Sequence, residues 1–173
     1  NNMELIITST TIAAMFFNIS TSSVSNGYCY NAETNGNEVN KITVFEASGK
    51  YLDRKLQYRF DYDALGRLAN KEAQRWNNLT EQWENVYKLV YHYTEMGFRL
   101  SRHDWDKKTQ SYGKATTLTD YEMLGDRLMA VTTYSWDTRK NDYTKVDGFV
   151  IMDPHEGLLL AESLSPILAN EQK

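Results

Sequence analysis

The chain of 173 residues contains one cysteine, two prolines and nine glycines, and these low counts exclude several classes of protein. The single cysteine, Cys29, cannot form an internal disulfide framework or a zinc site of clustered cysteines. The net charge of -4 leaves no surplus of Lys and Arg for nucleic acid, so we expect no nucleic-acid partner. The scarce prolines and the absence of a glycine period exclude collagen-like chains, and the length predicts one folded domain.

Aromatic residues make up 13% of the chain, and four of them begin a repeated motif of an aromatic residue, three further residues and a glycine. The four copies are Phe45–Gly49, Tyr62–Gly66, Tyr93–Gly97 and Tyr121–Gly125. In the last three copies the glycines lie 31 and 28 residues apart. This spacing indicates an internal repeat of roughly thirty residues.

A second motif alternates with the first and consists of a Trp, then Asn or Asp, and another aromatic residue seven positions after the Trp. The aromatic pairs are Trp76 with Trp83, Trp105 with Tyr112, and Trp136 with Tyr143. The residues that follow the leading Trp are Asn77, Asp106 and Asp137. Rings at this spacing can meet across two strands, and the Asn or Asp oxygen can cap the turn between them.

Apolar and polar residues alternate between the motifs, as they do in half-buried strands. Leu56, Tyr58, Phe60 and Tyr62 share one side of a strand, and the alternation recurs over 87–93 and 128–136. We therefore predict an all-β fold: an antiparallel meander of about eight long strands from repeated hairpins. Its sheet should be strongly twisted and curl toward a barrel or sandwich. Because the distance from Gly to Trp varies, we also expect a β-bulge within 99–105.

Each repeated glycine is expected at a chain reversal, where a hairpin loop commonly closes with a residue at positive φ. A fifth glycine ends the turn-like segment Asp153–Gly157, which predicts a hairpin between 149–152 and 158–161. A short helix over 155–164 is the alternative. The structural turn glycines are Gly49, Gly66, Gly97, Gly125 and Gly157.

The first 25 residues are expected to form a leader. No charged residue occurs from Leu5 to Ala32, and an apolar block precedes the small polar residues Ser20–Ser23. This order is typical of a secretory signal peptide, and the block is shorter than the about 20 residues of a membrane span. The alternative is an N-terminal core strand. Beyond the leader we expect a polar linker over 26–40, a single β-repeat domain over 41–164 and a tail over 165–173.

The segment Tyr62–Leu68 reads Tyr-Asp-Ala-Leu-Gly-Arg-Leu and resembles the YD repeat of the Rhs type, whose core is tyrosine, aspartate and then glycine-arginine-leucine. The other copies depart from that core: Thr94 follows Tyr93, and Asp126 interrupts the glycine-arginine step. Over roughly 42–145, the pattern is similar to small exported proteins of unknown function from gut Bacteroidetes. The resemblance implies hairpin architecture and a secreted, periplasmic or cell-surface location, and it implies no activity.

Reactive chemistry has little support in the sequence. The histidines, which show no metal-ligand spacing and are expected to face solvent, are His92, His103 and His155. The paired acids that a glycoside hydrolase would need are Asp61 with Asp63 and Asp104 with Asp106, but such pairs are common on solvated strands. We therefore predict a protein that is not an enzyme and has no metal and no cofactor.

Three functions follow from these patterns. The first is an exported binding or scaffold module that contacts a glycan or a cell-surface protein. Its candidate ligand-binding residues are Trp76, Asn77, Trp83, Trp105, Asp106, Tyr112, Trp136 and Tyr143. The same rings could instead fill the covered face of the sheet, and their regular spacing favours that packing role. The second function is a structural envelope protein that self-assembles through its aromatic face, for example as a homodimer. The third is a carboxylate-based glycoside hydrolase.

Overall fold

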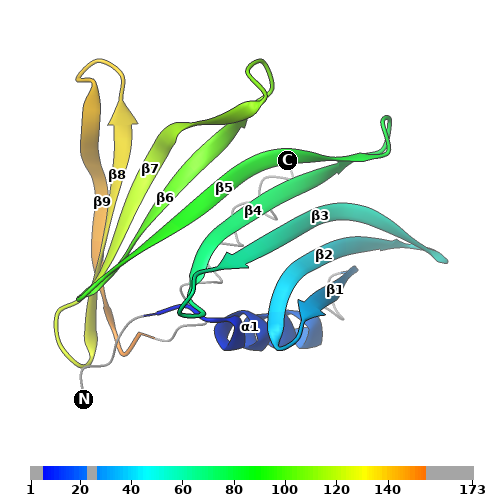
Figure 1. The fold of residues 1–173 in the computed structure, drawn as a ribbon, viewed down its shortest axis with the longest axis horizontal. Helices are drawn as coiled ribbons and strands as arrows, with labels where there is room; N and C mark the ends of the chain where they lie inside the picture. Colours follow the sequence, from blue (N-terminus) through cyan, green and yellow to red (C-terminus); the bar gives the residue numbers. More distant parts are fainter. Residues whose placement is uncertain (1–5, 23–26, 155–173) are drawn as a thin grey trace.

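The computed structural model describes residues 6–22 and 27–154, which form one helix and nine strands (Figure 1). The helix is α1 (Ser9–Ser22). The strands are β1 (Tyr28–Asn35), β2 (Glu38–Ser48), β3 (Tyr51–Tyr62), β4 (Leu68–Asn77), β5 (Gln82–Thr94), β6 (Gly97–Asp106), β7 (Ser111–Met123), β8 (Leu128–Asp137) and β9 (Asp142–Met152). Each strand pairs antiparallel with the next, in the order β1 to β9. The predicted antiparallel meander is confirmed, with nine strands in place of about eight.

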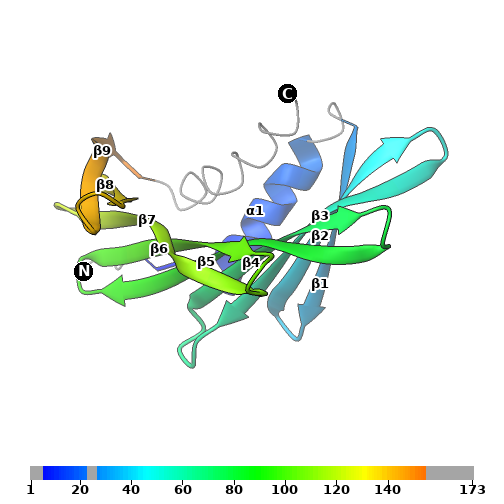
Figure 2. The ribbon, with the colours of Figure 1, turned by 90° about the horizontal axis from the view of Figure 1, so that it is seen from above.

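The sheet is twisted and curls without closing over the described residues. Strands β1 and β9 are its edges, and each has one neighbour. Figure 1 shows the strands fanning apart toward the β4–β5, β6–β7 and β8–β9 loops. Figure 2 shows α1 against one face, on the side toward which β8 and β9 rise. The helix thus covers part of the face that the sheet curls around.

The core lies on the face that α1 contacts, which we call the covered face. Strand alternation brings one apolar set to this face, and burial of that set stabilises the sheet. The predicted alternation of β3 is confirmed, because Leu56, Tyr58 and Phe60 are all buried. Core members on the strands include Val44, Leu56, Tyr58, Phe60, Leu68, Tyr87, Leu89, Tyr91, Phe98, Tyr121, Met129 and Val131.

The N-terminal segment packs against this core. Ile7 and Ile12 are buried, and the backbone N–H of Leu68 donates to the carbonyl of Ile7 at 2.7 Å. Residues 9–22 form a helix, so the alternative of a core strand there is wrong. Among the described residues, no helix has the length and apolarity needed to cross a membrane. Export and cleavage of the leader stay predictions.

The segment 26–40, expected to be a polar linker, contains β1 and the start of β2. Tyr28, Tyr30 and Ala32 alternate along β1 and pack against the core, a short pattern that the expectation of a linker overlooked. At the other end, the described chain stops two residues after β9. The second arm of the hairpin expected after 149–152, the alternative helix, Gly157 and the tail over 165–173 all lie outside the described residues.

The four repeated glycines that the structure describes lie in or beside chain reversals, as predicted. Gly49 and Gly66 have φ values of +60° and +74°, which a side chain would strain. At Gly97 the requirement is space, because a Cβ there would lie 1.9 Å from the carbonyl oxygen of Tyr121. Gly125 has neither a positive φ nor a close neighbour, so the predicted explanation is wrong at that position.

Candidate functional site

Each of the three Trp loops is closed by two aromatic rings that face each other across the hairpin. The paired residues are Trp76 with Trp83, Trp105 with Tyr112, and Trp136 with Tyr143. Their ring centroids are 5.1, 4.9 and 5.0 Å apart, at interplanar angles of 66°, 73° and 68°. Edge-to-face contact at this distance is a favourable aromatic geometry, so the predicted meeting of the rings is confirmed.

The loops between the rings share one conformation. The side-chain oxygens of Asn77, Asp106 and Asp137 accept the backbone N–H two residues ahead, at 2.9, 2.8 and 2.9 Å. The last loop residues, all with φ of 52° or 53°, are Glu81, Gln110 and Asn141. The predicted Asn/Asp caps are therefore present in all three loops. The three loops, between β4 and β5, β6 and β7, and β8 and β9, lie at the same end of the sheet (Figure 1).

All three aromatic pairs lie on the face opposite the core, which we call the solvent face. Ala73 pairs with Tyr87, but Gln74 pairs with Asn85, so β5 carries a bulge at Val86. The extra residue reverses the alternation, and Trp83 and Tyr87 therefore point to opposite faces. The pairing of β6 with β7 is irregular opposite Arg102–Trp105, but the extra residues lie on β7, so the bulge expected within 99–105 lies on the partner strand.

The expectation that the rings fill the covered face is therefore wrong. On β8, Trp136 shares its face with Tyr134, whereas Val131 points into the core. All six rings are half-buried: they pack on each other and on neighbouring polar side chains, and each keeps part of its surface in solvent. The trailing rings reach this face through bulges in β5, β7 and β9, which no residue type marks. On β8 no bulge intervenes: Met129 and Val131 are buried, so the alternation over 128–136 indicated the wrong set for the core.

Each pair also carries a cation against one of its rings. Arg54 lies 4.9 Å from the Trp76 ring centroid, Lys88 lies 5.0 Å from that of Tyr112, and Lys114 lies 3.3 Å from that of Trp136. These cations come from β3, β5 and β7, which are alternate strands of the sheet. Cation–π attraction places the charge against the ring and orients it.

Two of the pairs are tied to more distant strands by tyrosine hydroxyls. The hydroxyl of Tyr112 on β7 donates to the Glu72 carboxylate on β4 at 2.9 Å. Burial raises the pKa of Tyr112, and this hydrogen bond to Glu72 raises it further. The hydroxyl of Tyr143 donates to the carbonyl of Ala115 at 2.8 Å. Both rings thus lie across the solvent face and are fixed at both ends.

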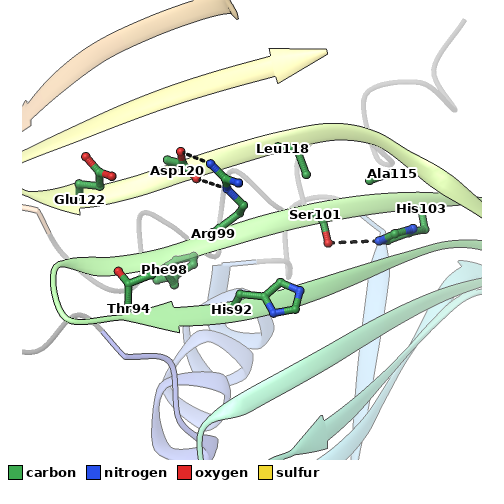
Figure 3. Close-up of a pocket in the computed structure, with 10 residues that line it drawn as sticks. All are labelled: His92, Thr94, Phe98, Arg99, Ser101, His103, Ala115, Leu118, Asp120 and Glu122. Atoms are coloured by element: carbon green, nitrogen blue, oxygen red, sulfur yellow. Dashed lines mark hydrogen bonds and ion pairs between the residues drawn. The ribbon is translucent and has the colours of Figure 1, made fainter. Parts of the chain in front are cut away.

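A groove of about 570 Å³ opens on the solvent face between β5, β6 and β7 (Figure 3). The residues that line it are His92, Thr94, Phe98, Arg99, Ser101, His103, Ala115, Leu118, Asp120 and Glu122. Arg99 donates two hydrogen bonds to the Asp120 carboxylate, at 2.6 and 2.8 Å. This planar pair presents both donors and acceptors along the groove.

His103 is held from both sides. Its Nδ1 lies 2.9 Å from the carbonyl oxygen of Gly113, and its Nε2 lies 3.1 Å from the hydroxyl of Ser101. A carbonyl only accepts, so Nδ1 carries the proton and Nε2 of the neutral ring accepts from Ser101. The expectation of solvent-facing histidines is confirmed for the exposed His92; His103 is on the same face but half-buried, with both nitrogens engaged, and His155 lies outside the described residues.

The groove lies beside the second aromatic pair on the solvent face. His103 lies two residues before Trp105 on the same strand and pairs across strands with Lys88. The groove, the ring pair of Trp105 and Tyr112, and the cation of Lys88 therefore form one continuous surface. The sequence patterns identify the rings but not the groove. Alternation along β6, which places Arg99, Ser101 and His103 on one face, was the available signal.

Three of the four candidate acids, Asp63, Asp104 and Asp106, hold neighbouring backbone or basic groups. The carboxylate of Asp63 accepts the backbone N–H of Leu65 and Arg67, and these bonds, that of Arg67 first, lower its pKa. Asp104 pairs with Arg102 at 3.0 Å, and Asp106 caps its loop. Neither pair lines the groove. Within 6–22 and 27–154, no cluster of His, Cys, Asp and Glu is arranged to hold a metal ion.

One buried cation lies on the covered face. Lys71 is 1% exposed, and its amine lies 4.7 Å from the ring centroid of Tyr58. Burial, followed by the charge of Arg102, lowers the pKa of Lys71 to about 7. It is buried among core side chains and is therefore separate from the exposed and half-buried cations of the solvent face.

Comparison with known proteins identifies relatives of unknown function. A family model described as a family of unknown function, DUF3836, matches residues 1–122. A protein with unknown function from Bacteroides fragilis has a similar fold, with a TM-score of 0.63, 16% identity, and coverage of 70% of this chain and 90% of its own. A DUF3836 protein from Bacteroides vulgatus is 23% identical, with a TM-score of 0.39 and coverage of 73% of this chain and 99% of its own. A DUF3836 protein from Parabacteroides distasonis is 18% identical, with a TM-score of 0.39 and coverage of 73% of this chain and 90% of its own. No curated protein matches the chain.

Proposed function

Since the chain belongs to the DUF3836 family, whose function is unknown, we propose on the basis of its solvent face that it is an exported, non-enzymatic module that binds a glycan. The observation that carries the proposal is the position of the three aromatic pairs. Rings that serve only the core would lie on the covered face, with Tyr87 and Phe98. These rings lie on the other face and are held by capped loops.

The surroundings of the rings suit a sugar. Flat aromatic surfaces pack against the C–H faces of sugar rings, and a few fixed polar groups give orientation. The groove supplies such groups in the Arg99–Asp120 pair and in exposed His92. Because the Arg99–Asp120 pair is already fixed by two hydrogen bonds, its side chains lose little conformational freedom on binding.

Export is the second part of the proposal. It rests on the uncharged stretch from Leu5 to Ala32 and on the YD-like motif at Tyr62–Leu68. A secreted, periplasmic or cell-surface location would bring the solvent face to extracellular glycans. Expression of the chain in a Bacteroides host, followed by N-terminal mass spectrometry of the exported fraction, tests this part. A new N-terminus within 22–26 supports it, and retention of the protein in the cytoplasm contradicts it.

A glycan-array screen tests binding. We expect the signal of the wild-type protein to fall at least tenfold in Trp105→Ala, which removes the ring that borders the groove, and to fall less in Trp76→Ala. The matched control is Tyr51→Ala, because Tyr51 is an exposed aromatic, 77% accessible, outside the three pairs. Unchanged signal in both Trp variants, or an equal loss in the control, contradicts the proposal.

Self-assembly is a second candidate function, favoured by the edge strand β9. Its last residues are apolar on both faces, and Phe149, Val150 and Met152 are exposed. An apolar run of this kind is typical of a strand with neighbours on both sides. A homodimer joined along β9 would supply that neighbour. Light scattering of the wild type and of Val150→Lys tests it: a dimer that dissociates in the variant supports it, and a monomeric wild type contradicts it.

A further inference from the structure

Resting on the proposed function, we infer that the ligand of the solvent face is an acidic polysaccharide that carries carboxylate or sulfate groups at regular intervals. The inference starts from Arg54, Lys88 and Lys114, the cations held against the three aromatic pairs. Each comes from a different strand, and together they recur across the sheet. A repeated array of this kind matches a polymer with repeated charges better than it matches a single small anion.

These three cations have no carboxylate partner of their own. Among the described residues, the ion pairs of the sheet engage other basic side chains, such as Lys41 with Glu33 at 2.7 Å and Arg99 with Asp120 at 2.6 Å. Arg54, Lys88 and Lys114 take part in none of the ion pairs in this part of the chain. Their charges are therefore available to an anion from outside.

Contact with the aromatic rings restricts the conformations of these three charged side chains before a ligand binds. A lysine or arginine side chain in solution loses much conformational freedom when it forms an ion pair, and this loss cancels most of the gain. A cation already held against an aromatic face loses less. Lys114, at 3.3 Å from the Trp136 ring and 5.8 Å from the Tyr143 ring, is the most firmly placed of the three.

The same face carries fixed negative charge, which argues against nucleic acid. Glu72 pairs across strands with Lys88, and Glu122 lines the groove. The chain as a whole has a net charge of -4. A nucleic acid brings one phosphate per nucleotide and needs a basic surplus, which this surface lacks. A polysaccharide with one charge on every sugar or every second sugar tolerates the intervening carboxylates.

The test compares neutral and acidic glycans with the four tryptophans as reporters. We would first screen an array that contains carboxylated, sulfated and neutral glycans. We would then titrate the protein with polygalacturonate and with its fully methyl-esterified form, which has the same backbone without the charge. We expect acidic glycans to dominate the hits, polygalacturonate to bind at least tenfold more tightly than its ester, and affinity to fall as salt rises from 50 to 200 mM.

Matched variants assign the charges. Lys88→Gln and Lys114→Gln should each weaken binding about tenfold, because each removes a charged hydrogen bond. Lys140→Gln, which removes the same charge from an exposed loop position, should have no effect. Glu72→Gln should tighten binding a few-fold, since it removes a negative charge beside Lys88 and leaves an oxygen to accept from Tyr112.

The outcomes separate this inference from the proposed function. Hits confined to neutral glycans, or equal affinity for polygalacturonate and its ester, overturn the acidic ligand and leave glycan binding intact. No hit of any kind overturns both. Binding of single-stranded oligo-dT in preference to every glycan overturns both in favour of nucleic acid. Equal losses of affinity in Lys114→Gln and Lys140→Gln would show that binding depends only on the net charge of the protein, and would overturn the assigned site.

Discussion

Alanine substitutions at the repeated glycines should have very different effects, although the sequence makes the four positions look alike. At Gly97 a Cβ would lie 1.9 Å from the Tyr121 carbonyl oxygen and 2.9 Å from its carbon, and both are backbone atoms that cannot rotate away. Strands β6 and β7 would have to separate at their closest point, beside the hydrogen bond from Met123 N–H to the Met96 carbonyl at 2.8 Å. Overpacking and the loss of a backbone hydrogen bond together should lower the free energy of unfolding by about 3 kcal/mol.

The other positions serve as internal controls. Gly66 has open space but a φ of +74°, so Gly66→Ala should cost about 1 kcal/mol, the penalty of a left-handed conformation. Gly125 has open space and no positive φ. Gly125→Ala should therefore be neutral or stabilising by about 0.5 kcal/mol, because alanine restricts the unfolded chain.

Urea unfolding followed by tryptophan fluorescence measures all three variants under one protocol. The expected order of stability is Gly125→Ala, then Gly66→Ala, then Gly97→Ala, with unchanged m-values. The reasoning is refuted if Gly97→Ala is as stable as Gly66→Ala, because the contact between β6 and β7 would then be absent. A large loss in Gly125→Ala would show that the β7–β8 turn has a different backbone.

Three further predictions concern charge and capping. Burial lowers the pKa of Lys71 to about 7, whereas the unfolded chain keeps its proton to about pH 10.4, so the unfolded state binds more protons in this window. The free energy of unfolding should therefore rise from pH 7 to 9.5, with a slope approaching about 1.4 kcal/mol per pH unit, and Lys71→Met should abolish the rise. Urea unfolding at each pH measures it, and the same pH dependence in the wild type and in Lys71→Met would contradict this. Asp137→Ala should lower the free energy of unfolding by about 1 kcal/mol, because it removes the oxygen that accepts from the loop backbone. Thermal unfolding measures the loss, and Thr138→Ala, at the exposed neighbouring position, should show no measurable change. In the Arg99–Asp120 pair, 48% of the Arg99 side chain is exposed to solvent. A double-mutant cycle should therefore give a coupling free energy of at most about 1 kcal/mol. A value above about 2 kcal/mol would contradict this, because solvent would then screen the pair less than its exposure implies.

The hairpins and the loops could be predicted from the sequence because their signals are local. Alternation marks Leu56 to Tyr62 as a half-buried strand, and the seven-residue spacing of Trp76 and Trp83 sets both rings opposite each other. The oxygen of Asn77 accepts from a backbone group two residues away, so its role needs no knowledge of the rest of the chain. Such features depend on spacing and on side-chain chemistry alone.

The faces of the trailing rings, Trp83, Tyr112 and Tyr143, could not be predicted, because they depend on bulges in β5, β7 and β9. One extra residue at Val86 places Trp83 and Tyr87 on opposite faces of the sheet, and the residue type of Val86 does not mark the bulge. The need for Gly97 arises from the backbone of β7, more than twenty residues ahead. The N-terminal apolar block suits both a leader and a packed helix, since both require the same hydrophobic side chains. The groove depends on three strands at once, and only the register brings His92, Ser101 and Asp120 to one surface.

The four tryptophans of the chain provide the most direct test of the solvent face as a binding surface. All four belong to the aromatic pairs: Trp76, Trp83, Trp105 and Trp136. Intrinsic tryptophan emission therefore reports on this face and on no other part of the molecule. Addition of an acidic polysaccharide should shift the emission to shorter wavelength and saturate, with the shift reduced in Trp105→Ala. Saturable binding by calorimetry with no change in emission would place the ligand elsewhere and contradict the account.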